Sequence, residues 1–171
     1  TVALLIQALF FGDGGILAFG ANCFNMAFVM PFAGYLIFRT IKAIIKNENG
    51  KYIAAFVSGY LALNIAAFFA AVEFGIQPLL FKDTSGLPMY SPYPLSVSIP
   101  AMLIPHLLVA GIVEGLITSG VYAYINRTSP GTLYAEKEFK IRPLYVLITA
   151  LILLTPLGLL APGTAWGEWG Q

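Results

Sequence analysis

Long apolar runs separated by short polar loops dominate the chain. The clearest runs cover residues 52–81, 95–125 and 143–160, and residues 26–38 complete a further apolar segment. A helix needs about 20 apolar residues to cross a bilayer, so the pattern predicts transmembrane helices. Pro100 and Pro105 each remove a helical hydrogen bond, which predicts a kink and allows the first part of residues 95–125 to lie along the membrane interface. The expected fold is all-α, a polytopic transmembrane helix bundle.

A stretch rich in glycine, aspartate and asparagine (residues 12–25, GDGGILAFGANCFN) interrupts the first two apolar runs. Glycine permits tight backbone turns, and Asp and Asn offer oxygen ligands. Inside a membrane, irregular backbone survives only where protein or a water-filled cavity satisfies its polar groups. One interpretation is therefore a broken or re-entrant segment near the outer face, of the kind that builds transporter sites. The other is a tight turn followed by a helix softened by glycine.

Composition supports a membrane location and excludes several other classes of protein. The chain has 171 residues, 58% hydrophobic and 10% charged, whereas soluble domains carry about 25% charged residues. A net charge of +1 without a basic stripe gives no reason to expect a nucleic-acid partner. The one cysteine, Cys23, excludes an internal disulfide framework and is interpreted as a small packing residue.

The distribution of Lys and Arg predicts the orientation in the membrane. Residues 39–51 carry four such residues, residues 82–93 carry one, and residues 126–142 carry four. Because short cytoplasmic loops are enriched in these residues, 39–51 and 126–142 are expected in the cytoplasm. Residues 12–15, 82–93 and the C-terminal tail are then expected outside. Trp166 and Trp169 in that tail are placed as an aromatic belt would be.

Ionisable residues within apolar runs are costly and are therefore candidates for function. They are Glu73, His106 and Glu114, with Asp13 in the glycine-rich stretch. Glu73 is near the outer end of its run and is expected to extend toward the interface. His106 and Glu114 are eight residues apart, about 80° of helical rotation, so they do not form a two-ligand metal pair.

Both residues have structural interpretations. His106 is expected as a neutral imidazole hydrogen-bonded between helices. Glu114 is flanked by Gly111 and Gly115. These small residues predict close helix packing around a carboxyl group that needs a hydrogen-bond donor, so Glu114 is interpreted as a structural polar lock.

No catalytic constellation is visible. The sequence contains no HExxH, no GxSxG and no P-loop, and it has one histidine. The chain is therefore not expected to be an enzyme, and it has no nucleotide motif of its own.

Several motifs together resemble one family. Residues 7–22 (QALFFGDGGILAFGAN) resemble the signature QALLLAHGGLTTLGAN of the CbiM/NikM proteins, the substrate-capturing membrane (S) subunits of energy-coupling-factor cobalt and nickel transporters. Residues 24–27 (FNMA) and 31–35 (PFAGY) are similar to the continuation of that signature. Residues 105–108 (PHLL) and 114–118 (EGLIT) resemble its late HLP…EGLLT helix, and residues 155–170 resemble the C-terminal segment of longer members.

The resemblance implies transport of Co²⁺ or Ni²⁺ as substrate, with no resident cofactor, at a site open to the outside. Its main ligands in the family are a Met-His start and a histidine of an SHPTG segment, which we expect upstream of Thr1. On that view residues 1–171 are a single transmembrane domain whose N-terminal helices and metal-binding N-terminus lie outside the sequence. Asp13 replaces the family's histidine, and we interpret it either as a residue that orients a metal ligand or as a ligand itself. Asn22 is interpreted as a residue that orients a metal ligand.

The leading hypothesis is the substrate-specific membrane component of an ATP-driven cobalt or nickel uptake transporter in the cell membrane. Its implied partners are a transmembrane coupling (T) subunit and separate ATPase subunits, besides the lipid bilayer. Two alternatives are a metal-free membrane scaffold or assembly subunit and a secondary transporter of an organic solute. An upstream Met-His start and SHPTG segment would favour the first hypothesis over both others.

Overall fold

The structure is a computed structural model that describes residues 1–11, 18–47, 49–134 and 149. The chain divides into two compact units, residues 1–23 with 135–171, and residues 24–134. In the first unit the described segments are helix α1 (Val2–Ile6), the π-helical turn η1 (Gln7–Phe11) and the short helix α2 (Phe19–Asn22). The predicted span at residues 143–160 and the tryptophans of the tail lie outside the described residues.

Helices make up the second unit. They are the π-helical turn η2 (Cys23–Val29), α3 (Met30–Ile44), α4 (Gly50–Leu80), α5 (Leu95–Pro105), the π-helical turn η3 (His106–Ala110), α6 (Gly111–Thr128) and α7 (Pro130–Tyr134). Among the described residues, three continuous helical stretches are long and apolar enough to cross a membrane: Phe19–Ile44, Gly50–Leu80 and Leu95–Thr128. The predicted all-α, polytopic transmembrane architecture is confirmed.

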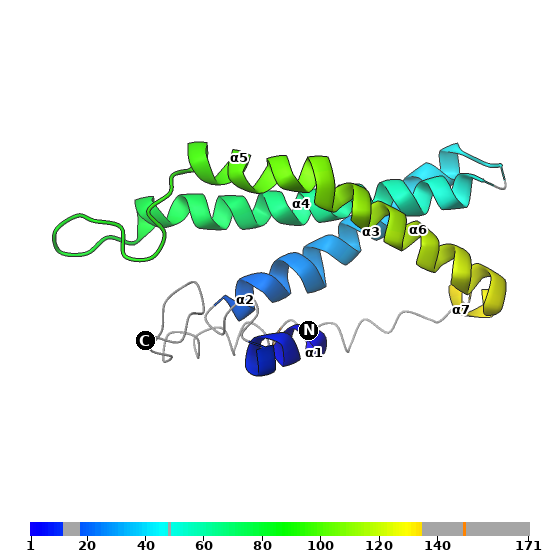
Figure 1. Ribbon diagram of the computed structural model, residues 1–171, viewed down its shortest axis with the longest axis horizontal. Coiled ribbons are helices and arrows are strands. Elements are labelled where there is room, and N and C mark those ends of the chain that lie inside the picture. The colour runs from blue at the N-terminus through cyan, green and yellow to red at the C-terminus, as the bar shows by residue number, and fades with distance from the viewer. Residues whose placement is uncertain (12–17, 48, 135–148, 150–171) are drawn as a thin grey trace. The chain divides into compact units, whose positions relative to one another are not determined.

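Helix α4 is the centre of the second unit and packs against α3, α5 and α6. Figure 1 shows α5 running alongside α4, with α3 and α6 beside the other half of α4. Its buried positions are almost all small, and they are Gly50, Ala54, Ala55, Ser58, Gly59, Ala62, Asn64, Ala66, Ala67, Ala71 and Gly75. In lipid, where no hydrophobic effect drives helices together, small residues allow backbones to approach and gain van der Waals contact.

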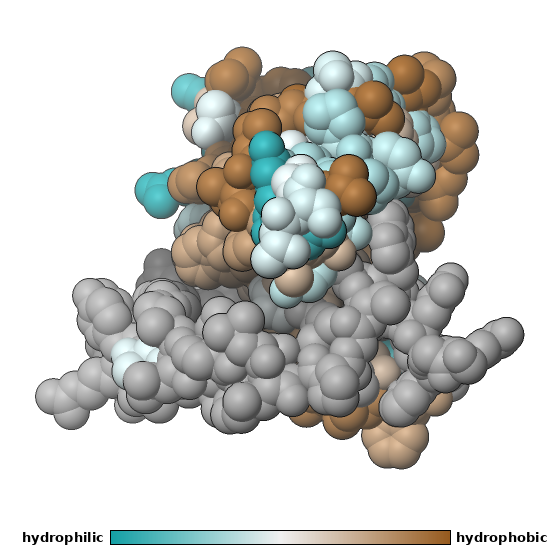
Figure 2. All heavy atoms as spheres, turned by 90° about the vertical axis from the view of Figure 1, so that its left-hand side faces the viewer, coloured by the Kyte–Doolittle hydropathy of each residue, from teal (hydrophilic) through white to brown (hydrophobic). Residues whose placement is uncertain are grey.

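Large apolar side chains point outward. On α6, Leu116, Ile117 and Val121 are exposed, and on η3 Leu108 and Val109 are exposed. Figure 2 views the second unit from the side of the loop between α4 and α5. Brown apolar atoms lie along the sides of the coloured region, and pale and teal atoms gather in its middle. This distribution suits a helix bundle surrounded by lipid.

The glycine-rich stretch is helical in its second half. Helix α2 begins at Phe19 and continues through η2 into α3. Residues 19–25 therefore fit the second interpretation, a helix softened by glycine, whereas residues 12–17, with Asp13, lie outside the described residues. A Cβ placed on Gly20 would meet no described atom within 4 Å, so no close approach of another segment requires glycine at this position.

Proline and π-helical turns adjoin one another. Pro31 is in the first turn of α3, directly after η2, and Pro105 directly precedes η3. Proline lacks an amide hydrogen, which loosens the helical ladder where the wider turns occur. Figure 1 shows the helix changing direction between α5 and α6, as the prolines predicted. However, α5 packs along α4 and does not turn away along an interface.

The loop after α4 is held by its own polar groups. One carboxylate oxygen of Asp83 accepts hydrogen bonds from the backbone N–H groups of Ser85 and Leu87, both at 2.8 Å. Gly86 has φ of +82°, a conformation that glycine adopts without strain. The loop therefore has a defined turn and joins α4 to α5 in antiparallel order.

Candidate functional site

A buried polar pair joins η2 to α4. The Nδ2 of Asn25 donates a hydrogen bond to Oε2 of Glu73 at 2.7 Å, across 48 residues of sequence. Asn25 is 4% exposed, and Glu73 is half-buried. Glu73 is thus held against a neighbouring helix by one carboxylate oxygen, which replaces the expected extension toward the interface. A buried amide that donates to a carboxylate is favoured because both groups would otherwise be unpaired in an apolar environment.

More polar atoms lie on the same half of α4. The side chain of Gln77, one helical turn after Glu73, has a buried Oε1 without a hydrogen-bond partner, and Oδ1 of Asn25 is in the same state. Ser98 on α5 donates to the carbonyl of Ala71 at 2.8 Å, which ties α5 to α4 in this region. Sequence analysis named Glu73 but missed its partner. The available signal was Asn25 itself, because the amide of an asparagine beside an apolar run needs a hydrogen-bond partner on a neighbouring helix.

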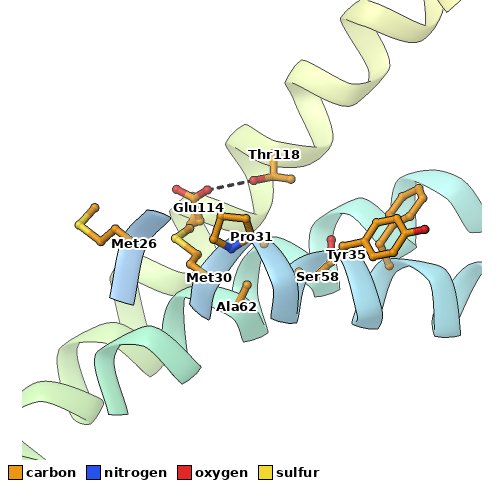
Figure 3. A pocket seen from close by; sticks show the side chains of 11 residues that line it. Met26, Met30, Pro31, Tyr35, Ser58, Ala62, Glu114 and Thr118 are labelled. Carbon is orange, nitrogen blue, oxygen red and sulfur yellow. Dashed lines mark hydrogen bonds between the residues drawn. The ribbon is translucent and has the colours of Figure 1, made fainter. Parts of the chain in front are cut away.

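A cleft opens between α3, α4 and α6. Its volume is about 430 Å³, and its lining residues are Met26, Met30, Pro31, Gly34, Tyr35, Phe38, Ser58, Gly59, Ala62, Glu114 and Thr118. Figure 3 shows Glu114 and Thr118 on α6, facing the cleft together with Met30 and Pro31. Most of the lining is apolar, and Glu114 supplies the one carboxyl group among these lining residues.

Glu114 obtains its hydrogen bond within its own helix. The hydroxyl of Thr118 donates to Oε1 of Glu114 at 3.0 Å (Figure 3). The flanking glycines face α4 closely, since a Cβ on Gly111 would lie 2.5 Å from Nδ2 of Asn64, and one on Gly115 would lie 2.8 Å from the carbonyl oxygen of Phe56. The glycines therefore permit the close approach of α6 to α4.

His106 bonds to the backbone of its own helix. Its Nδ1 lies 2.6 Å from the carbonyl oxygen of Met102, and a carbonyl can only accept, so Nδ1 carries the proton. The expectation that His106 bonds to another helix is therefore wrong, because its recorded partner belongs to its own helical stretch. The reason is local, because the amide of His106 bonds to the carbonyl of Leu103 and leaves the carbonyl of Met102 to the ring.

Of the predicted site residues, His106 and Glu114 do not share the cleft. Glu114 lines the cleft and His106 does not. Asn22 is half-buried at the end of α2, and Asp13 lies outside the described residues. In the part of the chain that the structure describes, no cluster of three or more His, Cys, Asp and Glu residues could hold a metal ion. Cys23 is 2% exposed and free, which suits packing.

Comparisons with known proteins identify relatives of the chain. A family model described as the cobalt uptake substrate-specific transmembrane region, CbiM, matches residues 1–132. The fused nickel transport protein NikMN of Rhodobacter capsulatus is 51% identical over 99% of this chain and 50% of its own length. The cobalt transport protein CbiM of Geobacter sulfurreducens is 36% identical over 78% of this chain and 35% of its own length.

A solved structure agrees with these relatives. The crystal structure of a transition metal transporter aligns with a TM-score of 0.69 and 52% identity, covering 74% of this chain and 54% of that one. The chain spans about half the length of the NikMN relative and of this solved chain. With its apolar helices, it is a membrane protein, and it belongs to the CbiM family of cobalt and nickel transport components.

Proposed function

We propose that the chain is part of the substrate-specific membrane component of an ATP-driven uptake transporter for Co²⁺ or Ni²⁺. Membership of the CbiM family carries this proposal, and relatives named as nickel and cobalt transport proteins support it. The divalent cation is the substrate and is captured at the outer face. The energy comes from ATPase subunits through a transmembrane coupling subunit, because the sequence has no P-loop.

The orientation follows from the charged loops. With residues 39–51 and 126–142 in the cytoplasm, α4 runs outward from Gly50 to Leu80. Residues 12–15, 82–93 and the C-terminal tail are then outside the cell membrane. In this orientation the pair formed by Asn25 and Glu73 lies in the outer half of the bundle, on the side from which the cation would arrive.

The named polar residues have separate roles in this proposal. Asp13 and Asn22 orient metal ligands by accepting or donating hydrogen bonds, and the main ligands belong to a segment preceding Thr1. His106 and Glu114 are structural. The bonds from His106 to Met102 and from Thr118 to Glu114 satisfy their polar groups within one helix, which supports that division.

Equilibrium dialysis of the purified full-length protein tests the proposal. The detergent-solubilised protein is dialysed against Ni²⁺ or Co²⁺, with Mg²⁺ as the control ion, and bound metal is measured by mass spectrometry. We expect about one Ni²⁺ or Co²⁺ bound per chain in preference to Mg²⁺. Absence of both bound ions would contradict metal capture and would favour the metal-free scaffold or the organic-solute transporter.

A further inference from the structure

The cleft between α3, α4 and α6 has the length of one membrane leaflet. Along the first of its walls the lining runs from Met26 to Phe38, which is roughly 18 Å at 1.5 Å per residue. Figure 3 shows Met26 at one end of the cleft and Tyr35 toward the other. The hydrocarbon core of a bilayer is about 30 Å thick, so the cleft is long enough for one lipid chain but does not cross the membrane.

Aromatic rings mark the end of the cleft that is proposed as cytoplasmic. The ring of Phe38 lies 5.5 Å from that of Tyr122 on α6, and Tyr122 lies 6.1 Å from Tyr52 on α4, measured between ring centroids. Tyr35, which lines the cleft next to this end, is 60% exposed. Tyrosine is enriched where a membrane meets water, so this end of the cleft is expected at the level of the lipid headgroups.

Two cations continue the lined face of α3 past that end. Arg39 follows Tyr35 by four residues and Lys42 follows Phe38 by four, so helical spacing places both on the face that lines the cleft. Both residues are exposed. Cations directly cytoplasmic of a transmembrane helix attract anionic lipids, and arginine binds a phosphate group through two parallel hydrogen bonds. An apolar cleft with cations at its mouth therefore matches a lipid that has an anionic headgroup.

We propose that this cleft holds an anionic phospholipid of the cytoplasmic leaflet. One acyl chain lies along the apolar lining, and the phosphate group contacts Arg39 and Lys42. Glu114 precedes Arg127, at the cytoplasmic end of α6, by thirteen residues, or about 20 Å of helix, so its carboxyl group lies near the far end of the chain and away from the phosphate. The inference goes beyond the proposed function and does not depend on which ion is transported.

A matched pair of arginine variants tests the headgroup site. Arg39→Gln removes a charge at the mouth of the cleft. Arg127→Gln removes the same charge at the same end of the bundle, but Arg127 follows Thr118 by nine residues, which at about 100° per residue places it on the opposite face of α6 from the cleft. Both arginines are exposed, so both variants are expected to fold.

A second pair tests the cleft itself. Gly34 lines the cleft, and a Cβ there would lie 3.4 Å from Cβ of Ala62, an ordinary contact, so Gly34→Leu fills the cleft without a backbone clash. Gly120→Leu is the control, because a Cβ on Gly120 would meet nothing within 4 Å. Each form of the full-length protein is stripped of lipid in detergent and titrated with dioleoyl phosphatidylglycerol or with dioleoyl phosphatidylcholine. Native mass spectrometry counts the bound lipid, and thermal unfolding shows whether each form is folded.

We expect the wild type to bind one phosphatidylglycerol about 10-fold or more tightly than phosphatidylcholine, which has the same chains and no net charge. Arg39→Gln should weaken phosphatidylglycerol binding about 5-fold, the effect of one cation near a membrane surface, and Arg127→Gln should not. Gly34→Leu should weaken the binding of both lipids, and Gly120→Leu should weaken neither.

Three results would each overturn the proposal. Equal binding of the two lipids by the wild type would show ordinary solvation by lipid. Equal losses in Arg39→Gln and Arg127→Gln would show a general effect of charge. A folded Gly34→Leu that binds phosphatidylglycerol like the wild type would show that no chain enters the cleft, and loss of a co-purified coupling subunit from that variant would assign the cleft to a partner helix.

Discussion

A Cβ atom placed on Gly59 would lie 2.7 Å from the side-chain oxygen of Thr118. That hydroxyl is the one that donates to Glu114, so this close approach of α4 to α6 lies directly beside the polar group in the cleft. The missing side chain of Gly59 thus makes room for the hydrogen bond on the facing helix. The packing of α4 against α6 and the hydrogen bond between Thr118 and Glu114 therefore depend on each other at this point.

Gly59→Ala should lower thermal stability. Overpacking of a close contact costs about 1–3 kcal/mol, which exceeds the gain of about 0.5–1 kcal/mol that alanine brings to a helix. Gly120→Ala on α6 is the matched control, because its Cβ would meet nothing within 4 Å. The measurement is the midpoint of heat unfolding in detergent, followed by size-exclusion chromatography. Equal midpoints for the two variants would show that the contact is not tight.

Replacement of Glu114 should affect stability more than metal binding. Glu114→Leu leaves the hydroxyl of Thr118 without its acceptor, and we expect a loss of about 1 kcal/mol in the free energy of unfolding. Glu114→Gln keeps an acceptor oxygen and serves as the control. Unfolding and nickel dialysis are measured on both variants. Loss of nickel with an unchanged unfolding midpoint would reverse the structural assignment of Glu114.

Asp13→Asn should weaken metal binding while the fold is kept. An aspartate that orients a ligand imidazole by accepting its N–H contributes roughly 10- to 100-fold in affinity. Equilibrium titration of the full-length protein with Ni²⁺ and with Co²⁺ measures the change. Unchanged affinity for both ions would contradict the orienting role, and the control is Asp83→Asn, in a loop that carries no proposed ligand.

The proposed orientation predicts opposite labelling of two loops. Thr84 and Lys46 are exposed, so cysteines placed there should react with maleimides. In intact cells a membrane-impermeant maleimide should label Thr84→Cys, whereas Lys46→Cys should need permeabilised cells. Cys23 is replaced by alanine beforehand. The reverse labelling pattern would invert the proposed topology.

The apolar runs at residues 52–81 and 95–125 were sufficient to predict helices there. Residues 52–81 and 95–125 correspond closely to α4 and to the continuous helix from α5 to α6, because a helix that crosses lipid must be apolar over about 20 residues wherever it packs. The small residues around Glu114 likewise predicted close packing, since small side chains at helical spacing have few other uses in a membrane.

The partners of the polar residues came only from the tertiary structure. Glu73 is paired with Asn25, 48 residues away, and such a pairing depends on the crossing of η2 over α4, which no local pattern encodes. His106 and Glu114 found partners within their own helical stretches, where the carbonyl of Met102 and the hydroxyl of Thr118 supply them. The sequence by itself thus determined the membrane class, these two long spans and the family resemblance, because apolarity and motif are local properties. Which polar groups meet was decided by helix packing, because it brings distant positions within hydrogen-bond distance.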